Sequence, residues 1–246
     1  MVKGILLDFF LPIILEVVMK IKVENVSKNF IKDKEQLEVL KDLSITFESG
    51  KLYVIVGKSG AGKSTFLKCL AALNTIDSGS ISFDDMEINN LNDKEISKFR
   101  NEKIGIVFQE FNLLEFLNTY ENVALPLVIN GKYNLEDEEL KKKAAELLEF
   151  VDLSDRYKHY PKELSGGEQQ RIAIARALIN DPDVILADEP TGSIDKENST
   201  NILKLLKKIS KEKCVIIVTH DDNVLKYADE IYNLKNGSLE KYESKK

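Results

Sequence analysis

The chain alternates short, nearly continuous apolar runs with longer segments in which apolar residues recur at helical spacing. Four runs rich in β-branched residues predict buried strands at 51–56, 104–108, 184–187 and 214–219. Runs that are apolar on both faces are typical of a parallel sheet covered by helices on both sides. The pattern therefore predicts an α/β fold.

Two segments between these runs carry an apolar stripe of helical period. In 136–151 the apolar residues recur every three or four positions, with oppositely charged pairs at i,i+4 on the other side. A second stripe predicts a helix that begins near Asp195. The stretch from about 110 to 163 is predicted to be mainly helical. Near the end of the chain, Asn236-Gly237 between two apolar runs predicts a β-hairpin with a two-residue turn.

Residues 4–18 form an apolar segment that the bulk pattern does not explain. The segment is too short to cross a bilayer, which takes roughly 20 apolar residues, and Asp8, Pro12 and Glu16 interrupt it. The first 30 residues contain no Ala that would mark a signal-peptide cleavage site. Three interpretations stay open: an extension that packs on the body, a segment lying on a surface, or a start codon assigned upstream of Met19. A strand-like run directly after Met19 favours the third.

Composition excludes several classes of protein. The 246 residues contain 35 Lys and Arg against 41 Asp and Glu, a net charge of −6, and 43% are hydrophobic. Such a chain can bury a sizeable core, which argues against intrinsic disorder. A net acidic chain also argues against a general nucleic-acid binder. Cys69 and Cys214 have neither metal-site spacing nor the pattern of a disulfide framework, which indicates a reducing compartment.

A glycine-rich segment directly after the first buried run predicts a phosphate-binding loop. It fits G-x-x-x-x-G-K-[ST] with a strand before it and a helix pattern after it. Its residues are Gly57, Lys58, Ser59, Gly60, Ala61, Gly62, Lys63, Ser64 and Thr65. Backbone N–H groups of such a loop cradle a triphosphate. We expect Lys63 to contact the β- and γ-phosphates and the Ser64 hydroxyl to bind Mg²⁺. The alternative, a glycine-rich turn that arose by chance, does not explain the flanking strand and helix.

Acidic residues at the end of the third buried run complete a nucleotide site. Asp188 and Glu189 follow the run 184–187, and His220 follows the run 214–219. Ligands of parallel sheets bind at the carboxyl ends of the strands. We expect Asp188 to hold Mg²⁺ and Glu189 to act as the general base that activates water. His220 is expected to orient that water at the γ-phosphate. The alternatives are a solvated acidic pair and a structural histidine.

Between these motifs, Leu164-Ser165-Gly166-Gly167-Glu168-Gln-Gln-Arg171 resembles the signature of the ABC (ATP-binding cassette) ATPases. The resemblance extends from Lys20 to Lys241. It implies that Phe30 stacks on adenine and that Gln109 is the glutamine that contacts Mg²⁺ and the nucleotide. It also implies that Asp195 belongs to the D-loop, and that His220 is the switch histidine.

The signature has two interpretations. Ser165 followed by Glu168 at the third position is a capping box, which is a purely structural role. A helix N-terminus with exposed glycines is also an anion site. The resemblance implies that Ser165, Gly166 and Gly167 bind the γ-phosphate of ATP held by a second subunit. Two ATP molecules then lie at the interface of a head-to-tail dimer.

The resemblance also implies the domain organisation and the partners. The fold is then a P-loop NTPase core of RecA-like type, with an N-terminal antiparallel β subdomain and an inserted helical subdomain. The expected boundaries are an extension at 1–19, an ATPase domain at 20–242 with a helical subdomain at about 110–166, and a tail at 243–246. ATP and Mg²⁺ are the expected ligands. An integral membrane permease and a second ATPase subunit are the expected partners, at the cytoplasmic face of the membrane, with no nucleic acid.

The stretches 108–114 and 121–127 are similar to the branch of macrolide export, lipoprotein release and antimicrobial-peptide resistance, and also to the cell-division member of that group. Export, or mechanical work on the far side of the bilayer, is the expected task. The helical segment after Gln109 is expected to form the permease groove, although Phe111, Leu113, Leu114 and Phe116 fit a plain core as well.

Two other functions are weaker alternatives. One is a soluble ABC ATPase that acts on nucleic acid or the ribosome. Members that act on chromosomes carry long coiled coils, and members that act on the ribosome usually carry two cassettes; this sequence shows neither feature. The other is a module that binds ATP without hydrolysing it. The presence of Glu189 and His220 argues against this module.

Overall fold

The computed structural model describes residues 18–32 and 35–242. A six-stranded sheet has the strand order β10-β9-β3-β8-β7-β6, and all its strands except β10 are parallel. These strands are β3 (Leu52–Val56), β6 (Ile104–Val107), β7 (Val184–Asp188), β8 (Cys214–Thr219), β9 (Glu230–Lys235) and β10 (Ser238–Lys241). The four buried runs of the sequence are thus four adjacent parallel strands, β3, β8, β7 and β6, as predicted.

Both faces of this sheet are covered at its centre, which is why β3 and β8 are buried at every position. Along β3, Tyr53 and Ile55 face one core, whereas Leu52, Val54 and Val56 face another. The first core lies between the sheet, helix α1 (Lys63–Leu70) and a smaller antiparallel sheet. Helices α5 (Gly166–Leu178) and α6 (Lys196–Ile209) cover the second face.

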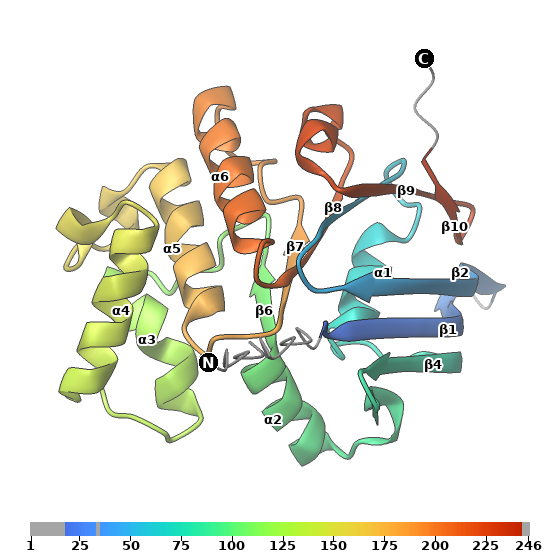
Figure 1. Ribbon diagram of the computed structural model, residues 1–246, viewed down its shortest axis with the longest axis horizontal. Helices are drawn as coiled ribbons and strands as arrows, with labels where there is room; N and C mark the ends of the chain where they lie inside the picture. Colours follow the sequence, from blue (N-terminus) through green and yellow to red (C-terminus); the bar gives the residue numbers. More distant parts are fainter. Residues whose placement is uncertain (1–17, 33–34, 243–246) are drawn as a thin grey trace, which may run out of the picture.

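The smaller sheet lies at the opposite side of the molecule from α3 and α4 (Figure 1). It has the order β2-β1-β4-β5 and is antiparallel. Its strands are β1 (Lys20–Lys32), β2 (Glu35–Glu48), β4 (Ser78–Phe83) and β5 (Met86–Glu87). The strand-like run after Met19 is therefore the start of β1. The antiparallel subdomain that the family resemblance implies is present.

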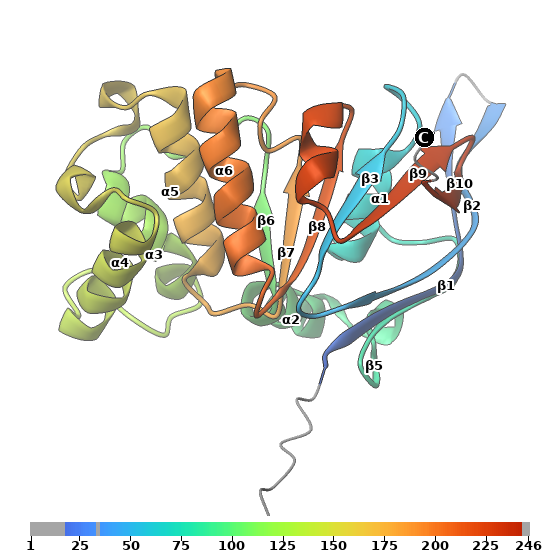
Figure 2. The ribbon, with the colours of Figure 1, turned by 45° about the horizontal axis from the view of Figure 1, so that its top comes forward.

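Three further helices flank β6 in the sequence. Helix α2 (Asp93–Lys103) precedes that strand, and α3 (Thr119–Ile129) and α4 (Glu138–Phe150) follow it. Short 3₁₀ turns, Ile88–Asn90, Ser154–Arg156, Pro161–Glu163 and Asp222–Tyr227, complete the described elements. Helices α3 and α4 pack on α5 around a third core, and Figure 2 shows them on the side of α5 away from the parallel strands. The predicted helices at 136–151 and from Asp195, and the helical stretch before the signature, are confirmed.

The predicted hairpin joins β9 to β10 through Asn236 and Gly237, whose φ angles are 52° and 82°. Both values lie in the left-handed region that a tight two-residue turn requires. The turn also contacts β2, since the N–H of Lys41 donates to the carbonyl oxygen of Gly237 at 2.8 Å.

The apolar segment 4–18 lies outside the described residues except for Val18, as does the tail 243–246. Within 18–32 and 35–242, none of the helices has both the length and the apolar character needed to span a bilayer. Cys69 and Cys214 are free and buried.

Candidate nucleotide site

The loop between β3 and α1 depends on glycine at three positions. Gly60 and Gly62 have φ angles of 79° and 99°, which residues with a Cβ rarely adopt. A Cβ at Gly57 would lie 2.5 Å from the carbonyl oxygen of Leu234, and one at Gly62 would lie 3.0 Å from that of Val39. The loop is therefore wedged between β9 and β2, which fixes its backbone before any ligand binds.

Lys63 begins α1 and extends back into this loop. Its Nζ donates to the carbonyl oxygens of Gly57 at 2.8 Å and Lys58 at 3.3 Å. The same amine lies 3.9 Å from Glu189 Oε1, and the side chain is only 8% exposed. Hydrogen bonds from an ammonium group to an anion are stronger than those to neutral carbonyl oxygens, so this buried amine can bind an anion in the loop.

Asp188 is the last residue of β7, and its carboxylate meets the first turn of α1. The Ser64 hydroxyl donates to Asp188 Oδ1 at 3.0 Å. Burial raises the pKa of Asp188, although the hydrogen bond from Ser64 acts in the opposite direction. Ionised Asp188 is therefore incompletely compensated by the protein, as expected for a carboxylate that binds a cation.

Glu189 follows β7 with a left-handed φ of 46°, and its backbone N–H donates to the carbonyl oxygen of Val218. Its Oε2 accepts a hydrogen bond from the Thr219 hydroxyl at 2.7 Å, and its Oε1 lies 2.7 Å from His220 Nδ1. The carboxylate thus has one partner on β8 and one just beyond that strand. This fixes its orientation, as general-base catalysis requires.

One cavity of about 620 Å³ joins these groups. Its lining residues come from β1, β2, the glycine-rich loop, α1 and the segments that follow β6, β7 and β8. They are Phe30, Val39, Ser59, Gly60, Gly62, Lys63, Ser64, Thr65, Gln109, Asp188, Glu189 and His220. Gln109 lies two residues beyond the end of β6, and His220 directly follows β8.

The signature residues and Asp195 are not among the residues that line this cavity. Ser165 caps α5: its Oγ accepts from the Glu168 N–H at 3.3 Å and donates to Glu168 Oε2 at 2.8 Å. Asp195 caps α6 and accepts from the N–H groups of Glu197 and Asn198. The capping box is therefore confirmed. Within one subunit, the signature is not part of the nucleotide cavity.

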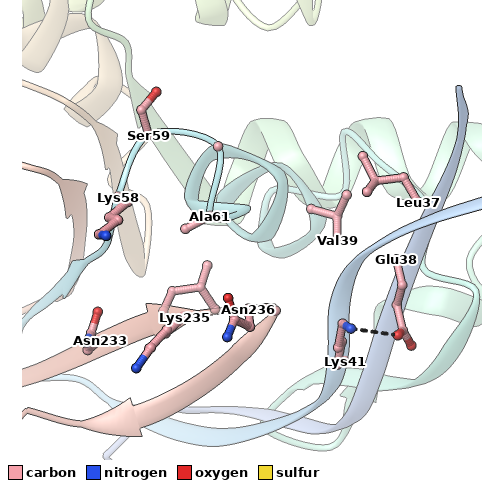
Figure 3. A pocket seen from close by; sticks show the side chains of 13 residues that line it. Leu37, Glu38, Val39, Lys41, Lys58, Ser59, Ala61, Asn233, Lys235 and Asn236 are labelled. Carbon is pink, nitrogen blue, oxygen red and sulfur yellow. Dashed lines mark ion pairs between the residues drawn. The ribbon is translucent and has the colours of Figure 1, made fainter.

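A second cavity of about 910 Å³ lies between the glycine-rich loop, β2 and the β9–β10 hairpin (Figure 3). It shares Val39, Ser59 and Gly60 with the first cavity, and Lys58, Ala61 and Lys235 also line it. Its one lining carboxylate, Glu38, is paired with Lys41 at 3.2 Å. Because Asp188, Glu189 and His220 do not line it, we assign the nucleotide chemistry to the smaller cavity.

Two polar residues near the site were missed by the sequence reasoning. Thr219 is fully buried and holds Glu189. Gln170 on α5 is also fully buried, and its amide donates to the carbonyl oxygens of Pro190 at 2.8 Å and Phe108 at 3.4 Å. The position of Thr219 at the end of a buried run is a weak sequence signal for a residue near the site. The role of Gln170 depends on tertiary packing alone.

Comparison with known proteins agrees with this geometry. The family model of the ABC transporters matches residues 40–192. An ABC transporter ATP-binding protein of Methanocaldococcus jannaschii, MJ0796, is 43% identical over 91% of this chain and 96% of its own length. A dimeric structure of MJ0796 in a post-hydrolysis state with ADP and Pi matches 92% of this chain with a TM-score of 0.82. The chain belongs to the ABC transporter ATP-binding proteins.

Two further relatives come from transport systems. The lipoprotein-releasing system ATP-binding protein LolD of Treponema denticola is 41% identical over 89% of this chain and 96% of its own length. The macrolide export ATP-binding/permease protein MacB of Mannheimia succiniciproducens is 40% identical over 89% of this chain, which matches only 34% of that protein. The expected ABC fold is confirmed, and the protein is an ATP-binding and ATP-hydrolysing subunit of a transporter.

Proposed function

We propose that this ABC ATPase hydrolyses ATP with Lys63, Glu189 and His220 in the cavity described above. The observation that carries this proposal is the convergence of these side chains on one cavity from separate segments. Lys63 binds the β- and γ-phosphates, Glu189 accepts the proton of the attacking water, and His220 orients Glu189 and that water. Gly57, Lys58 and Ala61 complete the backbone of the loop around the phosphates, and Phe30 stacks on the base.

Mg²⁺ fits the same cavity. The Ser64 hydroxyl and Asp188 carboxylate lie 3.0 Å apart, and Gln109 lines the same space. Oxygen donors of this kind are those that Mg²⁺ prefers. Burial raises the pKa of Asp188, which agrees with a carboxylate whose charge is balanced by a cation. Bound Mg²⁺ would neutralise charge on the phosphates.

The decisive variant is Glu189→Gln, which keeps the shape of the side chain and removes the base. We expect ATP binding to be retained and phosphate release to fall by about 10²- to 10⁴-fold. Glu115→Gln, at an exposed position, is the matched control. Phosphate release at the wild-type rate by Glu189→Gln would refute the assigned role.

We propose further that a second copy supplies Ser165, Gly166, Gly167 and Asp195 to complete each site. The supporting observation is that these residues lie on the N-terminal ends of α5 and α6 and do not line the nucleotide cavity of their own subunit. A helix N-terminus binds an anion through free N–H groups and the helix dipole. The relative MJ0796 forms a dimer with nucleotide.

The membrane partner we propose is a separate permease that docks at the cytoplasmic face of the membrane. A groove of about 570 Å³ lies between α2, β6, α3 and the C-terminal end of α5, at the border of the proposed helical subdomain at about 110–166. Leu125, Pro126 and Ile129 line it, and Ile129 is 72% exposed. Phe116 is 75% exposed, whereas Phe111 is half-buried. The ATP-binding and permease parts of MacB are named as one protein, which supports such a partnership.

Co-purification from native membranes tests the permease. We expect the wild-type chain to retain an integral membrane protein that Ile129→Asp loses. Met86→Asp, at an exposed residue 49% accessible on β5, should retain it. Equal retention by the two variants would place the permease elsewhere.

A further inference from the structure

Lys28 lies on β1, two residues before Phe30. Its side chain is only 11% exposed, although lysine side chains are mostly solvated. Its Nζ lies 3.0 Å from Asp77 Oδ1 and 3.4 Å from Thr75 Oγ1. The same Nζ lies 5.6 Å from the centroid of the Phe30 ring, which is cation–π distance.

Asp77 holds this arrangement from the other side. Its Oδ2 accepts a hydrogen bond from the N–H of Asn29 at 2.6 Å, and its own N–H donates to the carbonyl oxygen of Ser27 at 2.9 Å. These bonds lower the pKa of Asp77, first through the Asn29 N–H and then through Lys28. Asp77 is thus a fixed anion that anchors both the backbone beside Phe30 and the ammonium group above its ring.

Phe30 has few other constraints. Its ring is 41% exposed, and its cross-strand neighbour Leu37 is 52% exposed. Among the described aromatic residues, none pairs with it at stacking or edge-on distance. A half-exposed ring without an aromatic partner can adopt several rotamers, and a cation at one face restricts them.

We propose that Lys28, held by Asp77, is a positioning residue that fixes the Phe30 ring for stacking on the nucleobase. The inference rests on the proposed function, in which Phe30 binds the base. Fixing the ring beforehand lowers the entropy cost of binding. Lys28 does not itself line the cavity that Phe30 shares with Lys63 and Glu189. Because Lys28 acts through the Phe30 ring, its effect belongs to the base and not to the chemistry at the γ-phosphate.

The test compares ATP with tripolyphosphate, which has phosphates and no base. Lys28→Met removes the charge and keeps the length of the side chain. We expect it to raise the KM for ATP about 3- to 10-fold with kcat changed less than twofold, and to leave inhibition by tripolyphosphate unchanged. Lys28→Arg keeps a cation for both partners and should restore most of the affinity for ATP.

Two variants separate this inference from the proposed function. Lys22→Met, an exposed lysine on the same strand, should behave as wild type. Phe30→Ala should raise the KM for ATP at least as much as Lys28→Met. An unchanged KM in Phe30→Ala would refute the base site itself. A raised KM in Phe30→Ala with an unchanged KM in Lys28→Met would overturn the positioning role. Equal weakening of ATP and tripolyphosphate by Lys28→Met would also overturn it.

Discussion

At the scale of single residues, the two adjacent carboxylates after β7 lie in different surroundings. Asp188 accepts a hydrogen bond from one hydroxyl, and burial raises its pKa. Glu189 contacts Thr219, His220 and the amine of Lys63. Carboxylates that differ in this way suit different tasks. Asp188 fits a cation ligand, and Glu189 fits a base that is held in one orientation.

Asp188→Asn should stabilise the folded protein while it stops ATP turnover. Burial raises the pKa of Asp188, so its neutral form is favoured in the folded state. The stabilising contribution of this group is complete below its unfolded pKa of about 3.9 and is lost as pH rises through the folded value. Asparagine can still accept the hydrogen bond from Ser64.

Thermal unfolding at several pH values checks this expectation. Asp188→Asn should unfold at a higher temperature than wild type at pH 7, and the difference should vanish near pH 3, roughly one unit below the unfolded pKa. Asp85→Asn, on the exposed turn before β5, is the control. A lower unfolding temperature at pH 7 would show that the protein compensates the Asp188 charge after all.

Thr219 should matter for turnover although it is buried beside the cavity. Thr219→Val preserves the shape of the side chain and removes the 2.7 Å hydrogen bond to Glu189. We expect kcat to fall about 10-fold, which corresponds to about 1.4 kcal/mol, with little change in the KM for ATP. Thr219→Ser should recover most of the rate. Steady-state phosphate release measures both, and an unchanged kcat in Thr219→Val would remove Thr219 from the site.

At the scale of elements, a helix N-terminus can have a structural role, as a cap, and a binding role, as an anion site. Both α2 and α5 begin with a complete capping box, from Asn92 to Glu95 and from Ser165 to Glu168. Only the second is followed by two glycines, Gly166 and Gly167, whose backbone N–H groups lie in the first turn and have no partner within the helix. Gly167 also packs closely on α6, since a Cβ there would lie 2.4 Å from the Asn198 side chain.

Ser165→Ala and Asn92→Ala form a matched pair. Each removes one cap, so each should lower the free energy of unfolding by about 1 kcal/mol. Only Ser165→Ala should also lower ATP hydrolysis, by at least 10-fold, because only Ser165 is proposed to contact the γ-phosphate. Denaturant unfolding and phosphate release measure the two effects. Equal hydrolysis by the two variants would leave Ser165 with a structural role alone.

Several elements could be predicted from local sequence because local physics decides them. The buried runs, the glycine-rich loop and the Asn236-Gly237 turn each carry their signal within a few residues. The strand order could not be predicted: β8 lies between β3 and β7, although it follows both in sequence. Long-range packing decides this order, and it brings His220 to Glu189.

Other features of the site were hidden for the same reason. Phe111 and Asn112 both have left-handed φ angles, of 41° and 52°, directly after Gln109 and Glu110. Arg176, 64 residues from Asn112, donates to the carbonyl oxygens of both. Burial lowers the pKa of this arginine. The loop conformation therefore depends on a contact with α5 that no local pattern contains.

At the scale of the whole molecule, the nucleotide cavity and the signature belong to different elements. The cavity is lined from the antiparallel sheet and the ends of β3, β6, β7 and β8, whereas the signature begins α5, which packs with α3 and α4. A single subunit thus has the phosphate loop beside Asp188, Glu189 and His220 and, apart from them, the N-terminus of α5, which is proposed to bind the γ-phosphate held by a second subunit. A complete ATP site, as proposed, therefore needs a second subunit.

The most direct test of this central claim is the molar mass of Glu189→Gln with and without ATP, measured by light scattering after gel filtration. We expect a mass near the 27.9 kDa of one chain with ADP and about twice that value with ATP, since unhydrolysed ATP joins two subunits. Adding Ser165→Ala to Glu189→Gln should weaken the ATP-bound dimer. A Glu189→Gln chain that binds ATP and keeps the mass of a monomer would contradict the shared site.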